Sequence, residues 1–129
     1  MVQGSRDRDW RPHRETIEAA LRCWLEEGIT AVVCASDHLA LVLWQCAEKL
    51  GAKIPEQLSV TGVNDLPVAA RRRLTTIRFP FARVGRAAIS TLMEQFNDED
   101  LPAGRKRLPV ELIVRGSTAP PPIPWGNHL

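Results

Sequence analysis

The sequence has no apolar run approaching the roughly 18 residues that a membrane-spanning helix needs. Its first residues, 1–5, lead straight into charged residues without the apolar core of a signal peptide. It also contains no GxSxG, GxGxxG, HExxH or CxxC motif and no phosphate-binding P-loop. These absences predict a protein without a membrane span and give no support to a catalytic function.

Cysteine is scarce, and the three residues Cys23, Cys34 and Cys46 lie on predicted buried faces without metal-ligand spacing. An odd number of cysteines without evident pairs fits the reducing cytoplasm. The three histidines have no partners that would form a catalytic constellation. We therefore expect no metal, no cofactor and no catalytic residues, and we expect a cytoplasmic protein that is not an enzyme.

The net charge and the length of the chain also limit which functions and how many domains it can have. The net charge of +2 is too small to indicate nucleic-acid binding by itself, and the run at residues 71–73, three arginines, is expected to be a solvated loop. A hydrophobic content of 44% and a charged content of 25% are ordinary for a soluble globular protein. With 129 residues, the chain is one domain or part of one.

The most informative stretch is residues 30–51, TAVVCASDHLALVLWQCAEKLG. Residues 31–35 have no polar break, which is typical of a parallel strand covered on both faces. Ser36 or Asp37 is a good N-cap for a helix that reaches Leu50, and Gly51 suits the position after its end. The turn thus lies where a strand ends and a helix begins, which is where open α/β sheets bind ligands.

That helix has more apolar surface than packing on one sheet requires. The excess favours a second partner, most simply another copy of the chain; the alternative is cover by other parts of the same chain. The residues expected at a dimer interface are Leu39, Val42, Leu43 and Cys46.

Strands and helices alternate along the chain, which predicts an α/β fold with a mostly parallel sheet and helices on both of its faces. The expected strands are residues 1–3, 31–35, 58–63, 74–77 and 110–114, the last at an edge, and the expected helices begin at Pro12, near Asp37 and at Ala82.

Polar residues follow three of these strands, and in a parallel sheet such loops meet at one edge. Their side chains suit a ligand rich in hydroxyl or amide groups, and two aromatic residues offer flat apolar faces. Simpler roles compete: Asp37 as a helix cap, Asn64 and Asp65 as turn residues, Trp10 as core. The candidate ligand-binding residues are Arg6, Asp9, Trp10, Ser36, Asp37, Asn64 and Phe81.

Linked motifs run through most of the chain: A-S-D-x-x-A, then G-x-x-x-P-x-x-x-S-V-x-G-x-x-D, then L-T-T-I, then S-T-A-P. Together they resemble the C-terminal part of the lactose-repressor/galactose-repressor (LacI/GalR) family of bacterial transcription regulators, over residues 6–121. The resemblance implies one lobe of a type I periplasmic-binding-protein-like fold, in which effector binds between two lobes. It also implies a homodimer, and operator DNA bound only through an N-terminal helix-turn-helix domain that is missing here.

Residue by residue, the resemblance places Arg6, in an R-x-x-D-W setting, at an effector-binding arginine. Ser36 stands where an asparagine is frequent, and Asn64 replaces the first aspartate of G-[FY]-D-D. Val63 lacks the usual aromatic ring. The implied effector is therefore a sugar or a related small polar metabolite, with purine-like compounds as an open alternative.

The resemblance also divides the chain. Residues 1–78 would form the C-terminal lobe, residues 79–116 a crossover helix and strand that would join the missing N-terminal lobe, and residues 117–129 a flexible proline-rich tail. The last helix and strand would then either fold onto the remaining lobe or be exchanged between chains. Two alternatives remain: a lobe of a periplasmic-type solute-binding protein, and an enzyme on a flavodoxin-like sheet.

Overall fold

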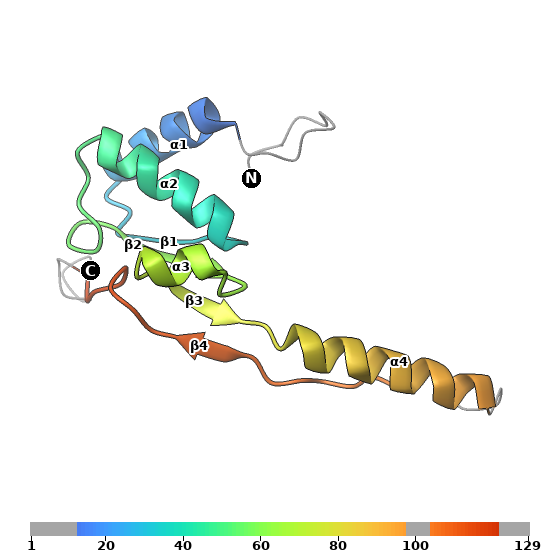
Figure 1. Cartoon of the computed structure of the whole chain (residues 1–129). Helices are drawn as coiled ribbons and strands as arrows, with labels where there is room; N and C mark the ends of the chain where they lie inside the picture. Colours follow the sequence, from blue (N-terminus) through green and yellow to red (C-terminus); the bar gives the residue numbers. More distant parts are fainter. Residues whose placement is uncertain (1–12, 98–103, 122–129) are drawn as a thin grey trace, which may run out of the picture.

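The computed structural model describes residues 13–97 and 104–121 (Figure 1). The predicted strand at residues 1–3 lies outside this part of the chain. The elements follow the order α1 (Arg14–Glu26), β1 (Ala31–Val33), α2 (Asp37–Lys49), β2 (Ser59–Val63), α3 (Pro67–Arg71), β3 (Thr75–Arg78), α4 (Phe81–Asn97) and β4 (Glu111–Ile113). Apart from the short helix α3, which the sequence pattern does not predict, every element lies at nearly the predicted bounds.

The four strands form one sheet in the order β1-β2-β3-β4. The first three are parallel, with Val32 beside Val60 and Gly62 beside Thr76. β4 pairs antiparallel with β3 at the edge. The predicted mostly parallel sheet with an edge strand at its end is confirmed.

Helix α2 begins and ends where the sequence indicates. The Ser36 hydroxyl accepts a hydrogen bond from the Leu39 amide at 3.2 Å and so caps its first turn. Gly51 follows its end with φ of +77°, a left-handed conformation that glycine adopts without steric cost. α2 packs on β2 with one side, while α1 packs on α2 through Leu21, which is completely buried.

Two expectations about burial were wrong. β1 is an edge strand among the described residues, and Val33 is 79% exposed rather than covered. Cys34 and Cys46 are buried as expected, but Cys23 lies exposed on α1 beside Glu27. The apolar run at residues 31–35 indicates a strand suited to burial, but it does not identify which part of a protein would cover the strand.

The predicted boundary of the flexible tail, at residue 117, is too early in the chain. Ser117 is completely buried, and its hydroxyl donates to the Val60 carbonyl at 2.6 Å and accepts from the Thr75 amide at 2.8 Å. The Thr118 hydroxyl lies 3.1 Å from that of Thr75. Residues 117–119 therefore bridge β2 and β3, because their polar groups satisfy backbone groups that the strands leave free.

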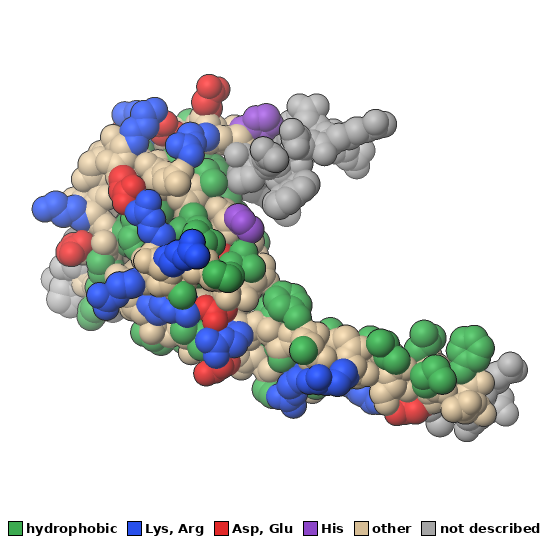
Figure 2. All heavy atoms as spheres, viewed as in Figure 1, with side chains coloured by type: hydrophobic (Ala, Val, Ile, Leu, Met, Phe, Trp, Pro, Cys, Tyr) green, Lys and Arg blue, Asp and Glu red, His purple; other side chains and the backbone are tan. Residues whose placement is uncertain are grey.

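Helix α4 projects away from the rest of the molecule, and the segment leading to β4 runs back along it (Figure 1). No residue of α4 is buried. Large apolar side chains stay in solvent on it, including Ile89 at 65% and Phe96 at 78% exposure. Helix α4 and residues 104–110 together form a projecting arm. Figure 2 shows hydrophobic side chains gathered along it. The arm thus carries one apolar face without a partner among the described residues.

Candidate functional site

The carboxyl ends of β1, β2 and β3 lie at one edge of the sheet because these strands are parallel. Of the predicted ligand-binding residues, Ser36, Asp37, Asn64 and Phe81 follow these strands, as expected. Arg6, Asp9 and Trp10 lie outside the described residues.

Asp37 connects the loops of this edge from inside. Its side chain is completely buried, and one carboxylate oxygen accepts a hydrogen bond from the Thr76 hydroxyl at 2.6 Å. The other accepts from the Leu66 amide at 2.7 Å. Gly62 makes room for this carboxylate, since a Cβ there would overlap Asp37 Oδ1. In this structure Asp37 therefore organises the edge, and the helix-capping role belongs to Ser36.

The loop after β2 has an unusual backbone. Asn64 has φ of +111° and Asp65 has φ of +54°, in the half of conformational space that side chains disfavour. The backbone N–H of Asn64 donates a hydrogen bond to the Ile77 carbonyl at 2.8 Å. Its side chain is half-buried and makes no hydrogen bond to the described residues. Asn64 is thus a polar group held in a defined place with bonding capacity to spare.

Asp65, by contrast, is fully engaged. Its carboxylate oxygens lie 2.7 Å from Arg78 Nε and 2.7 Å from Arg115 Nη2, and Arg78 also contacts Glu111 at 3.0 Å. The hydrogen bond from Arg115, followed by that from Arg78, holds the pKa of the Asp65 carboxyl below its usual range. This ion-pair cluster fixes the loop against both β3 and β4.

An aromatic pair begins just beyond β3. The rings of Phe79 and Phe81 stack with centroids 5.8 Å apart, and they are 41% and 60% exposed. Phe81 is therefore available as an apolar surface near the strand ends, and Phe79 adds to it.

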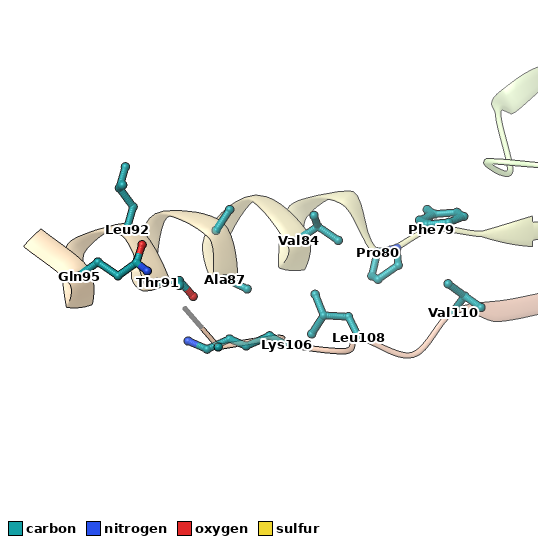
Figure 3. A pocket seen from close by; sticks show the side chains of 12 residues that line it. Phe79, Pro80, Val84, Ala87, Thr91, Leu92, Gln95, Lys106, Leu108 and Val110 are labelled. Carbon is teal, nitrogen blue, oxygen red and sulfur yellow. The ribbon is translucent and has the colours of Figure 1, made fainter. Parts of the chain in front are cut away.

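A hollow among the described residues lies elsewhere. A groove of about 630 Å³ runs between α4 and residues 104–110. In Figure 3 the side chains of Val84 and Leu108 point toward each other across it. Its lining is mainly apolar and belongs to the exposed arm, with none of the strand-end residues Ser36, Asp37 or Asn64. The groove is therefore an exposed apolar surface separate from the polar residues at the strand ends.

Comparison with known protein families matches residues 3–118 to the periplasmic binding protein-like domain. The chain belongs to this family. The match covers most of the chain and includes the whole sheet, so the recognition of one lobe of this fold from the linked motifs is confirmed.

The related proteins are LacI-family regulators, and the chain corresponds to their C-terminal part. The regulator MalR of Streptomyces coelicolor is 40% identical over 107 residues, which are 81% of this chain and 31% of MalR. The repressor CytR of Escherichia coli is 39% identical over 96 residues, 73% of this chain and 28% of CytR. The chain thus spans about a third of the length of the curated relatives that it matches.

A solved structure gives the same result. The LacI family regulator from Enterococcus faecium, determined with bound ribose, superposes with a TM-score of 0.70 at 28% identity. The superposition covers 83% of this chain and 40% of that regulator. The periplasmic-binding-protein-like fold is therefore established by sequence and by structure.

Within this domain, two of the predicted dimer-interface residues do not form a surface. Leu43 is 3% exposed and Cys46 is 1% exposed, because they pack into the chain's own core. Including them was wrong, since a side chain buried within one chain cannot contact a second. Leu39 and Val42 are half-buried and retain accessible surface.

The described residues add little else of chemical interest. Across residues 13–97 and 104–121, no group of three or more His, Cys, Asp or Glu side chains is placed to hold a metal ion. None of the helices in that part is long and apolar enough to cross a membrane. Burial raises the pKa of the Cys34 thiol to about 11, so this buried cysteine is protonated at neutral pH and not a nucleophile.

Three side chains that hold these loops together were not predicted from the sequence: Thr76, Arg78 and Arg115. A buried aspartate requires hydrogen-bond donors, so a search for the partners of Asp37 would have pointed to hydroxyl-bearing residues on neighbouring strands. No local pattern marks Arg115 as the partner of a residue 50 positions away.

Proposed function

We propose that this domain senses a small polar effector for a LacI-type transcription regulator. The supporting observation is the edge formed by the carboxyl ends of β1, β2 and β3, where Asp37 and Asp65 brace the loops from behind. Ser36 and Asn64, which are half-buried, and Phe81, which is exposed, then lie at the solvent-facing rim of this edge. Such a rim offers hydroxyl and amide groups next to an apolar face, which suits a ligand with both polar and flat surfaces.

The ligand that fits these groups best is a sugar or a related metabolite. Amide and hydroxyl side chains match the hydroxyl groups of a sugar, and an exposed aromatic ring matches its apolar face. The ribose bound to the Enterococcus faecium regulator, which shares the fold, supports this class. A nucleoside, which also has a flat base and a sugar, is the alternative that the experiment below includes.

In the intact regulator, α4 and residues 104–110 would pack in an N-terminal lobe that closes over the effector. The exposed apolar side chains of α4 and the groove beside it support this division at residues 79–116. The accessible side of α2, with Leu39 and Val42, would form a homodimer. Operator DNA would be bound by a separate helix-turn-helix domain, as the names of the HTH-type relatives suggest.

Effector binding would act by population shift. An effector changes the balance between two arrangements of the lobes only by its difference in affinity for them. Because this chain supplies one side of the cleft, we expect weak binding that requires high ligand concentrations for detection.

The experiment is a titration followed by ¹H–¹⁵N correlation NMR, with ribose, a disaccharide and a nucleoside added in turn. We expect one ligand class to shift the amide signals of Ser36 and Asn64 in a saturable manner. The substitution Asn64→Ala should abolish the shifts, whereas Asn97→Ala, at the exposed end of α4, should leave them unchanged. Shifts confined to the α4 groove, or none with any of the three, would contradict the proposal.

A further inference from the structure

Strands β1, β2 and β3 with helices α1, α2 and α3 form one body. The polypeptide passes from this body into the arm and back at two neighbouring places. It leaves after Arg78, the last residue of β3, and runs into α4. It returns through β4 and reaches Arg115 two residues later. Where β3 and β4 pair, Arg78 lies opposite Glu111. These two crossings are the only connections between the arm and the rest of the described chain.

The Asp65 carboxylate bonds to both crossings. One oxygen lies 2.7 Å from Arg78 Nε and the other 2.7 Å from Arg115 Nη2. Arg115 is itself fixed, because its Nη1 donates to the Leu74 carbonyl at 2.9 Å and its amide donates to the Thr75 hydroxyl at 2.9 Å. The side chains of Asp65 and Arg115 are 9% and 18% exposed, so solvent screens their charges only partly.

The backbone at Asp65 and at the residue before it has an unusual conformation. Asp65 and Asn64 both have positive φ, a conformation that non-glycine residues keep only when their surroundings hold it. The Asn64 amide is bonded to β3 through Ile77, and the Leu66 amide is bonded to Asp37. The two arginines restrain the same turn through the Asp65 carboxylate.

We propose that Asp65 is a positioning residue that couples the placement of Asn64 to the two chain crossings at Arg78 and Arg115. A shift of either crossing would pull on the carboxylate and re-orient the strained turn that carries Asn64. Conversely, a ligand that fixes Asn64 would favour one position of the crossings, since coupling between two sites is reciprocal. The significance of this link for effector sensing depends on the function proposed above, but the link itself is a property of the unliganded chain.

The test is hydrogen exchange measured residue by residue by NMR on the unliganded chain. The variants Arg115→Lys and Arg78→Lys keep the positive charge and remove the fork of guanidinium donors. We expect each to accelerate exchange of the Asn64 and Leu66 amides by at least about tenfold, although both amides belong to another segment. In an Asp65→Asn background, Arg115→Lys should have no further effect at Asn64, because the link is already broken.

The matched control is Arg72→Lys, which weakens an exposed pair with Glu48 at 3.2 Å and should leave Asn64 and Leu66 unchanged. Amides of α2 report general opening. Faster exchange confined to residues 111–116 in Arg115→Lys would overturn the proposal, and so would equal acceleration throughout α2. Because no ligand is present, a failure here is distinct from a failure of the NMR titration, which tests the proposed function.

Discussion

The Thr76 hydroxyl donates a hydrogen bond of 2.6 Å to the carboxylate of Asp37 at a point closed to solvent. Asp37 begins α2 and Thr76 lies in β3, two strands away from β1 in the sheet. With its second bond, to the Leu66 amide, one side chain joins the helix start, the β2–α3 loop and β3. The edge of the sheet where the parallel strands end thus has its own polar core.

Replacing this carboxylate should be costly. We expect Asp37→Ala to lower the free energy of unfolding by about 3 kcal/mol, because it leaves two buried donors without an acceptor and a cavity beside them. Urea unfolding followed by circular dichroism measures the change. Glu56→Ala, at an exposed loop position, should change it by less than about 0.5 kcal/mol. A similar small effect for Asp37→Ala would show that the bonds contribute little.

Gly62 has a role that depends on the same carboxylate. A Cβ at this position would overlap Asp37 Oδ1 and lie 3.0 Å from Leu74 Cδ2. We therefore expect Gly62→Ala to destabilise the fold by about 2–3 kcal/mol, as overpacking of a buried site does. Gly85→Ala is the matched control: this glycine in α4 has open space around it, and alanine should stabilise the helix by about 0.5–1 kcal/mol. Opposite signs in thermal unfolding would confirm both assignments.

Much of this architecture could be predicted because it is local. The apolar run of β1, the N-cap Ser36 and the terminating Gly51 mark one strand and one helix within about twenty residues, and the structure has both. Ligand-facing candidates such as Asn64 follow from the position of loops after parallel strands. The linked motifs then indicate the family, which the comparison confirms.

The remaining features depend on contacts between distant parts of the chain. Ser117 looks like the start of a proline-rich tail, yet its hydroxyl completes hydrogen bonds of β2 and β3. Leu43 and Leu39 have the same side chain and lie one turn apart, but only the three-dimensional packing makes one core and leaves the other half-buried. Periodicity marks an apolar face without identifying which neighbour covers it.

The ion pairs of Asp65 predict how stability depends on pH. Arg115 and Arg78 hold the pKa of Asp65 below its usual range in the folded state. A carboxyl with a depressed folded pKa stabilises the fold above its unfolded pKa of about 4, and this contribution is lost as pH falls through the folded pKa. We expect the stability difference between wild type and Asp65→Asn to be largest near pH 6 and to shrink toward pH 2.

Urea unfolding at several pH values measures this difference. Glu48→Gln, which removes an exposed acid paired with Arg72, should show a much smaller pH-dependent difference because solvent screens that pair. A difference between wild type and Asp65→Asn that stays constant from pH 6 to pH 2 would mean that ionisation of Asp65 does not stabilise the fold.

Dimerisation through α2 can be tested at Val42, which packs at the margin of the core and not within it. Val42 is half-buried, so Val42→Asp should leave the helical circular dichroism intact while placing a charge in the proposed interface. Burying an unpaired charge costs several kcal/mol, so sedimentation equilibrium should show association weakened by at least about 100-fold. Ala19→Asp, on the exposed side of α1, should leave association unchanged. Leu43→Asp would instead unfold the monomer, because Leu43 belongs to the core. A wild-type chain that stays monomeric at high concentration would show that the accessible side of α2 does not form a dimer in this chain.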